Sequence, residues 1–266
     1  MSSKVNFDTI AKRYDLINEV ISFGLVNLWR STFSRLVAEG LKRRSVTIVD
    51  QDLDVLEIGV GSGKQLHSVL KKINKLNLKT DHVFGIDQSK EMLKIAQNNV
   101  NKWEEKNVRL VNLPLEQYSP VDQKFDLVIM SFALRNIPDV FGALEKSKKL
   151  LKPGGQLAVL DFSTPRLLLR PFVIIYERFI LWRIARLLGG NGHSYRYLTN
   201  SIEKWYTPQN VSYLFEKAGF KKMIVKRSWS GIVCTHIYHS PTLAELEDYK
   251  RQSSKPLRSV SIMQNN

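Results

Sequence analysis

The sequence is poor in cysteine: among its 266 residues it holds one, Cys234. A single cysteine forms no intramolecular disulfide, no cysteine zinc cluster and no CxxC redox pair. The sequence therefore indicates a reducing compartment. Cys234 falls in a β-rich run, where a buried structural thiol is the expected role.

Long apolar runs are also missing. No uninterrupted run approaches the roughly 20 residues that span a bilayer. The first residues show neither the basic-then-apolar order of a secretory signal nor the Arg/Ser-rich composition of a transit peptide. We expect a cytoplasmic protein, or a protein of an organelle matrix if a presequence has been removed.

Acidic residues are scarce relative to basic ones. The chain has 25 Asp and Glu against 40 Lys and Arg, a net charge of +15 and a pI near 9.8. Such a charge favours a polyanionic partner, either nucleic acid or an anionic membrane surface. The excess is local, because residues 163–240 hold 12 basic and 3 acidic side chains, whereas residues 1–162 are nearly balanced.

Short apolar runs alternate with longer amphipathic runs between residues 54 and 161. The pattern predicts strands at 55–58, 83–86, 108–111, 125–131 and 156–160, and helices at 64–75, 89–102 and 140–151. This alternation indicates βαβ units and an α/β fold with a parallel sheet covered on both faces. We expect Lys152-Pro153-Gly154-Gly155 to form the turn before the last of these strands.

The flanking segments are mainly helical in pattern. Helical spacing of apolar residues covers 26–41 before the core and 165–206 after it. A helix at 208–218 and two β-rich runs at 220–225 and 232–238 follow. The polar residues 241–266 predict a short helix and then disorder.

A glycine-rich loop, Glu57-Ile58-Gly59-Val60-Gly61-Ser62-Gly63, follows one predicted strand and opens a predicted helix. Glycines let the backbone approach a ligand closely, and the helix N-terminus offers free N–H groups. The dinucleotide fingerprint needs a third glycine where Lys64 stands, and the phosphate loop fails at Ile58 and Gln65. The pattern fits a nucleoside ligand without a pyrophosphate, and Glu57 suits an α-amino group.

Asp87 ends the next predicted strand, where α/β nucleotide sites bind ribose hydroxyls. This combination resembles the class I S-adenosylmethionine-dependent methyltransferases. Phe125–Ser131 and Leu151–Gly155 are similar to that superfamily's fourth strand and the turn before its fifth. The resemblance implies a Rossmann-like, mostly parallel seven-stranded sheet with helices on both faces, and S-adenosyl-L-methionine as cofactor.

Four further segments resemble the ubiquinone/menaquinone biosynthesis C-methyltransferases, the UbiE family. They are residues 7–30, Ser131-Phe132-Ala133-Leu134-Arg135-Asn136, residues 194–202 and residues 231–236. The resemblance covers roughly residues 6–239. It implies C-methylation of a polyprenylated benzoquinol or naphthoquinol by a methyltransferase domain at 1–240, with an N-terminal helical cap at 1–50, a helical insert at 163–206 and a polar tail at 241–266.

The resemblance also implies which residues form the site. The expected cofactor-binding residues are Glu57, Gly59, Gly61, Ser62, Gly63, Asp87, Asn112, Leu113 and Ser131. Asp87 would accept the ribose hydroxyls, and the Asn112 amide would meet the adenine edge. We expect no metal.

A quinol carbon becomes nucleophilic when the neighbouring hydroxyl ionises, so the site needs a base or hydrogen bonds that stabilise the phenolate. Arg135, Asn136 and Tyr14 are the candidates for this network. Alternatives stay open for each: a structural salt bridge for Arg135, a helix cap for Asn136 and a core position for Tyr14. Arg135 is no ready base, because its pKa lies above about 12.

Residues 171–188 read PFVIIYERFILWRIARLL and have the spacing of an amphipathic helix. One interpretation is a lid that admits the prenyl tail and rests on anionic lipid, which would make the protein peripheral on the inner face of a membrane. The other is a helix packed on the domain with a solvated charged side. A homo-oligomer or a quinone-biosynthesis complex is a further expectation.

Two rival functions use the same fold. A nucleic-acid methyltransferase would explain the basic charge, but residues 131–134 lack the Asn/Asp-Pro-Pro-aromatic motif of amino-base methylases, and Cys234 lacks a preceding proline. We therefore expect no nucleic-acid partner. A non-catalytic partner protein would have no need of the intact glycine loop and Asp87.

Overall fold

Seven strands form one sheet in the computed structural model, which describes residues 11–45, 52–103, 107–176, 183 and 205–253. The order across the sheet is β3-β2-β1-β4-β5-β7-β6. The strands are β1 (Leu53–Ile58), β2 (Thr80–Ile86), β3 (Val108–Val111), β4 (Phe125–Ser131), β5 (Leu151–Phe162), β6 (Lys221–Arg227) and β7 (Val233–His239). β1 to β5 pair in parallel, and β7 runs antiparallel to both of its neighbours. This confirms the mostly parallel seven-stranded sheet.

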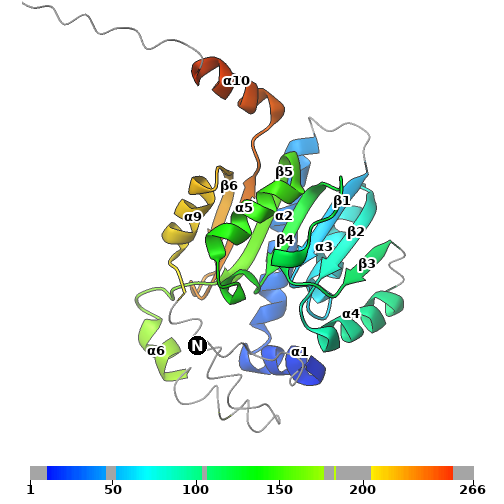
Figure 1. The fold of residues 1–266 in the computed structure, drawn as a ribbon. Coiled ribbons are helices and arrows are strands. Elements are labelled where there is room, and N and C mark those ends of the chain that lie inside the picture. Colours follow the sequence, from blue (N-terminus) through cyan, green and yellow to red (C-terminus); the bar gives the residue numbers. More distant parts are fainter. Residues whose placement is uncertain (1–10, 46–51, 104–106, 177–182, 184–204, 254–266) are drawn as a thin grey trace, which may run out of the picture.

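Helices cover both faces of the sheet (Figure 1). The described helices are α1 (Ala11–Ile21), α2 (Leu25–Ser45), α3 (Lys64–Asn74), α4 (Lys90–Lys102), α5 (Val140–Leu150), α6 (Arg170–Ile175), α9 (Pro208–Lys217) and α10 (Leu243–Ser253), with short 3-10 turns η2 (Leu115–Gln117) and η3 (Leu134–Asn136). Side chains of α5 and α9 share one core cluster, and side chains of α2, α3 and α4 share the other.

The alternation of strand side chains creates the two clusters. On β1, Leu56 and Ile58 point into the cluster of α5 and α9, and Leu53 and Val55 point into the opposite cluster. β4 is buried on both faces from Phe125 to Met130, as a central strand of a parallel sheet is.

Cys234 on β7 is 2% exposed, which confirms the predicted buried cysteine. Burial raises the pKa of its thiol to about 12, so the reactive thiolate is disfavoured.

One predicted turn is wrong. Lys152-Pro153-Gly154-Gly155 lies inside β5, which begins at Leu151. Leu151 pairs with Phe125, the next pair is Gln156 with Leu127, and the register shifts between them. Gly154 adopts a φ of 72°, which only glycine accepts easily. The breaker residues therefore form an irregularity within a strand.

The two ends of the sheet carry different elements (Figure 1). α1 and α6 lie beyond the carboxyl ends of the parallel strands, and α10 lies beyond the opposite end. α6 is the helix described within the predicted insert at 163–206, of which 177–182 and 184–204 lie outside the described residues. No helix in the described part of the chain is long and apolar enough to cross a membrane.

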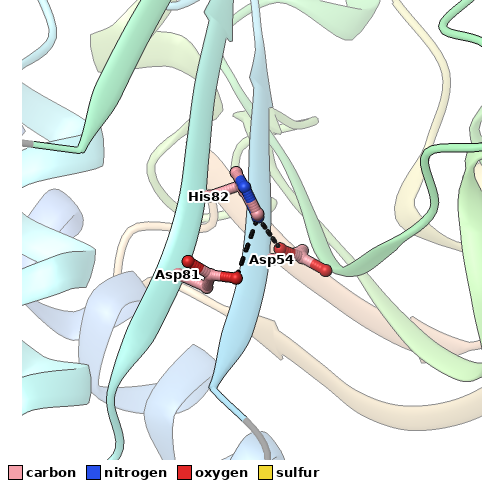
Figure 2. A group of neighbouring side chains, drawn as sticks. All are labelled: Asp54, Asp81 and His82. Carbon is pink, nitrogen blue, oxygen red and sulfur yellow. Dashed lines mark hydrogen bonds and ion pairs between the residues drawn. The ribbon is translucent and has the colours of Figure 1, made fainter.

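A cluster of charges joins four strands, β1, β2, β4 and β5, at their amino ends. The Lys152 Nζ lies 2.9 Å from Oδ2 of Asp54 and 2.7 Å from Oδ2 of Asp126. Figure 2 shows the outer part of the cluster, where Nδ1 of His82 lies 3.0 Å from Asp54 and 3.1 Å from Asp81. Burial raises the pKa of Asp54, but the hydrogen bonds and charges of Lys152 and His82 outweigh that effect and lower it overall.

We expect Lys152→Met to reduce the free energy of unfolding by about 1–3 kcal/mol, because Asp126 and Asp54 lose their shared partner. The pKa of Asp54 is lowered in the folded protein, so this stabilisation is present above the unfolded pKa and is lost as the pH falls through the folded pKa. Urea denaturation at neutral and acidic pH measures both effects. Lys149→Met, an exposed position on α5 with the same change of charge, is the control; equal losses for the two variants would contradict the prediction.

Candidate cofactor site

A cavity of about 470 Å3 opens at the carboxyl ends of β1, β2 and β4. Open α/β sheets bind their ligands at this edge, and small-molecule sites commonly measure about 300–1,000 Å3. Eight residues predicted from the sequence line the cavity: Glu57, Gly59, Gly61, Ser62, Asp87, Leu113, Ser131 and Asn136. Gly63, Asn112 and Arg135 are not among its lining residues, and the side chain of Tyr14, a residue of α1, lies outside what the structure describes.

The glycine loop needs its glycines for conformation and for space. Gly59, Gly61 and Gly63 have φ values of 69°, 54° and 80°, in the left-handed region. A Cβ at Gly59 would lie 2.7 Å from the Cβ of Ala133, so the loop packs directly on the turn after β4. Gly63 lies outside the cavity wall and is the N-cap residue of α3. It therefore shapes the loop.

Asp87 holds the glycine loop from the end of β2. Its Oδ2 accepts a hydrogen bond of 2.9 Å from the backbone N–H of Gly61, and its Oδ1 accepts one of 2.8 Å from Ser89. A carboxylate oxygen accepts more than one hydrogen bond, so ligand hydroxyl groups can share Asp87 with these backbone donors. The Nδ2 of Asn112 donates to the carbonyl oxygen of Asp87 at 2.9 Å. Asn112 thus positions the end of β2, and its role at an adenine edge stays a prediction.

The turn after β4 forms the opposite wall. The Oγ of Ser131 is buried, and it has no hydrogen-bond partner among the described residues. Phe132 has a φ of 55°, an unfavourable value for a side chain of this size. Its carbonyl oxygen accepts hydrogen bonds from Nη1 of Arg135 at 2.8 Å and from Nδ2 of Asn136 at 3.2 Å. These two side chains stabilise the strained backbone conformation.

Arg135 forms a buried ion pair. Its Nη1 lies 2.7 Å from Oδ1 of Asp161 on β5, and both side chains are 4% exposed. The guanidinium also stacks over the ring of Phe162, 4.7 Å from the ring centroid. The structural interpretation of Arg135 therefore has direct geometric support, and a direct catalytic role stays a prediction. Asn136 does not cap α5, because Asp139 is the N-cap residue and accepts from Gly142.

Sequence reasoning missed Arg30 of α2 and Lys64 of α3, which also line the cavity. Arg30 lies in the segment 7–30 that resembles the UbiE family, but the sequence alone assigned it no role in the site. Its Nη2 lies 3.8 Å from Oδ1 of Asp15, and Nζ of Lys64 lies 3.3 Å from Oδ2 of the same carboxylate. Asp15 thus links α1 to two cavity residues that lie 34 positions apart in the sequence.

Glu57 is the most deeply buried charged group of the cavity wall, with 1% of its surface exposed. Burial raises the pKa of Glu57 well above its usual value; the charge of Arg30 opposes this shift and that of Asp87 adds to it. Its Oε2 has no hydrogen-bond partner among the described residues. The site therefore contains a carboxyl group that gains from a cationic or hydrogen-bond-donating ligand.

The family model of the ubiE/COQ5 methyltransferases matches residues 2–239. The chain belongs to this family. It is 34% identical over 232 residues to a demethylmenaquinone methyltransferase of Tropheryma whipplei, covering 86% of this chain and 88% of the relative. It is 32% identical over 240 residues to the ubiquinone/menaquinone biosynthesis C-methyltransferase UbiE of Proteus mirabilis, covering 89% of each.

Solved structures agree on the fold of this family member. A methyltransferase from Aquifex aeolicus, described as SAM-dependent, superposes with a TM-score of 0.51 at 21% identity, over 74% of this chain and 88% of that one. The [4+2]-cyclase SpnF superposes with a TM-score of 0.55 at 14% identity, over 80% and 81%. The fold is thus the Rossmann-like class I methyltransferase fold that the glycine loop predicted.

As a ubiE/COQ5 methyltransferase, the protein is an S-adenosylmethionine-dependent enzyme. The residues of the cavity fit this cofactor. The unpartnered Oε2 of Glu57 and Oγ of Ser131 are buried polar atoms that a polar ligand would satisfy, and the glycine loop leaves room for close backbone approach. Asp87 places its carboxylate at the end of β2, where α/β sites hold a ribose.

The raised pKa of Glu57 predicts a pH-dependent affinity for S-adenosylmethionine. A ligand ammonium group favours the carboxylate, so binding releases a proton wherever empty Glu57 is protonated, and the affinity rises with pH. Titration calorimetry from about pH 6 to pH 7.5, below the α-amino pKa of about 8, in buffers of different ionisation enthalpy measures both quantities. Glu57→Gln should bind more weakly and without proton release. An affinity that falls with pH in the native protein would refute this assignment.

Proposed function

We propose that this protein transfers a methyl group from S-adenosylmethionine to a ring carbon of a polyprenylated benzoquinol or naphthoquinol. The observation that carries the proposal is the cavity at the carboxyl edge, bounded by the glycine loop and by the turn after β4, in a chain of the ubiE/COQ5 family. The names of its relatives, demethylmenaquinone methyltransferase and UbiE, support a quinone acceptor.

S-adenosylmethionine supplies an electrophilic methyl group on a sulfonium, so the remaining task of the protein is to place and activate the acceptor carbon. Ser131 at the end of β4 and Asn136 on the turn after it line the cavity. Ser131 is proposed to line the methyl donor, and Asn136 is proposed to contact the acceptor. A donor at this position stabilises the negative oxygen of an ionised quinol. Neither side chain is a strong base, so the hydroxyl proton leaves to water or to a base beyond these two residues. After taking the methyl group from sulfur, the ring carbon would lose its own hydrogen as a proton, which restores the quinol ring.

Arg135 is proposed to act through the turn. Its Nη1 donates to the Phe132 carbonyl and pairs with Asp161, which fixes the backbone that presents Ser131 and Asn136. In this role Arg135 is a positioning residue. Tyr14 stays a proposed contact of the acceptor, supported by its neighbour Asp15, whose carboxylate pairs with two cavity residues.

An apolar surface suits the prenyl tail. It comprises exposed residues of α1, α2 and the turn between them (Leu16, Val20, Phe23, Leu25 and Leu28) and of α6 and its approach (Leu167, Leu168, Phe172, Ile174 and Ile175). The two parts touch, because the Tyr176 hydroxyl donates to the Ile21 carbonyl and its ring centroid lies 5.6 Å from that of Phe23. We call these residues the α1–α6 surface.

The α1–α6 surface is also the proposed membrane contact. It lies beyond the carboxyl ends of the parallel strands, the same end as the cavity (Figure 1). Arg166 and Arg170 are exposed beside its apolar residues. Apolar side chains flanked by arginines favour binding to an anionic bilayer, where a polyprenyl quinol resides. The protein is thus proposed to act as a peripheral protein on the inner face of a membrane.

The proposed reaction is tested with the purified protein, S-adenosylmethionine and two demethylated acceptors, one benzoquinol and one naphthoquinol, both prenylated. We expect a product with one additional methyl group on carbon from at least one acceptor, identified by mass spectrometry and NMR. Gly59→Ala, whose Cβ would collide with Ala133, is the inactive control. No product from either ring, or methylation on oxygen, would reject the acceptor assignment.

The α1–α6 surface predicts a dependence on tail length. Leu168→Ser combined with Phe172→Ser should raise KM for a long-tailed quinol by about tenfold or more, since burying each such side chain contributes about 1.5–3 kcal/mol. KM for a tail-less quinol should stay unchanged, and binding to anionic vesicles should weaken. Val121→Ser, an exposed apolar position that is 87% exposed and far from α6 in sequence, is the control. Equal effects on both quinols would count against the surface.

A further inference from the structure

Arg30 is a mostly buried cation whose Nε donates to no described residue. It lies on α2, its side chain is 13% exposed, and it lines the cavity. Its Nε is buried without a hydrogen-bond partner among the described residues. The carboxylate of Asp15 lies 3.8 Å from Nη2, which is longer than a hydrogen bond. A buried guanidinium in this state gains from an anionic ligand that accepts two N–H groups.

Glu57 is the complementary group in the same wall. It is the buried carboxyl with an unpartnered Oε2, and the charge of Arg30 acts on it across the cavity wall. The two residues come from α2 and from the end of β1, so neither belongs to the other's local structure. One cation and one acid, both with unused hydrogen-bonding atoms, match the carboxylate and ammonium that an α-amino acid carries on one carbon.

We propose that Arg30 binds the α-carboxylate of the methionine moiety of S-adenosylmethionine, beside an ammonium held by Glu57. This inference rests on the proposed placement of the cofactor and is independent of the acceptor. It makes Arg30 a specificity-determining residue, because a nucleoside without the carboxylate leaves the guanidinium with only its long contact to Asp15. It also makes the N-terminal helices part of the cofactor site.

Lys64 is the competing cation of the cavity wall. Its side chain is 40% exposed, and its Nζ lies 3.3 Å from Oδ2 of Asp15. Solvent and Asp15 can both contact its ammonium group, so pairing with a ligand carboxylate contributes less binding free energy at Lys64 than at Arg30. Asp15 stands between the two cations and keeps both near the loop. The geometry thus selects Arg30.

Three ligands separate the contributions of the carboxylate and the ammonium group. The first is S-adenosylhomocysteine, and the second is 5′-(3-aminopropylthio)-5′-deoxyadenosine, its analogue without the carboxylate. The third is 5′-methylthioadenosine, which lacks both charged groups. Titration calorimetry gives their dissociation constants for the native chain and for Arg30→Met. We expect Arg30→Met to weaken S-adenosylhomocysteine by about tenfold or more, the size of a lost charge-assisted hydrogen bond. The other two ligands should change by less than about threefold, within the ordinary scatter of such effects.

Three variants complete the test. Arg30→Lys should recover part of the affinity for S-adenosylhomocysteine, Lys64→Met should lose less than Arg30→Met, and Arg35→Met, an exposed arginine paired with Glu39 on the same helix, should lose none. The proposal is overturned if Arg30→Met weakens all three ligands equally, if Lys64→Met has the larger effect, or if the native chain binds the analogue without the carboxylate as tightly as S-adenosylhomocysteine. The last comparison needs no variant to fold. No binding of any ligand would instead contradict the placement of the cofactor, and failure with quinols would leave these affinities unchanged.

Discussion

The site depends on a buried ion pair between Arg135 in η3, the turn after β4, and Asp161 on β5. Asp161 on β5 accepts hydrogen bonds from Nη1 of Arg135 at 2.7 Å and from its backbone N–H at 3.1 Å. The same guanidinium holds the Phe132 carbonyl, and so keeps a bulky residue in the left-handed region. A strained backbone of this kind persists only where its surroundings over-determine it. Here the ion pair and the hydrogen bond of Asn136 do so.

This turn also fixes the cofactor side. Gly59 packs so closely on Ala133 that a Cβ would not fit, which means that a displaced turn would displace the glycine loop. Asp87 holds the same loop from the other side through Gly61. The loop is therefore pre-formed between two supports before any ligand arrives. Pre-organised donors and acceptors of this kind cost no rearrangement at the moment of binding or reaction.

The sequence was sufficient for the parts that follow from local patterns. The strands at 108–111 and 125–131 have the predicted ends, and the glycine loop and Asp87 meet as predicted, because period, breakers and strand ends are local properties. The prediction of a turn at 152–155 was wrong for the opposite reason. The glycines and the proline lie where β5 pairs irregularly with β4, and no local pattern reveals that pairing. Arg30, 27 residues before Glu57, is a cavity residue only because α2 packs on the sheet.

The same limit applies to Arg135 and Asn112. The sequence placed both at the site, but not the partners that occupy their side chains, Asp161 and the Asp87 carbonyl. Asp161 lies on β5 and Asp87 directly follows β2, so each partner comes from a distant part of the sequence. Tertiary packing therefore decides between structural and ligand contacts. Functional motifs therefore predicted the neighbourhood of the reaction more reliably than the role of each side chain within it.

The described basic residues of 163–240 lie on separate surfaces of the fold. Lys217 on α9 lies over the ring of Phe141, and Arg227 on β6 donates to the Thr164 carbonyl. Lys221 and Lys222 are exposed on the outer strand of the sheet, where charges also protect an edge from pairing with other chains. These cations make contacts within their own surroundings, so the excess of basic residues counted along this segment does not form one basic patch. The exposed apolar residues of α1, α2 and α6 therefore support the proposed lipid contact, and the neighbouring arginines would add electrostatic attraction to an anionic bilayer.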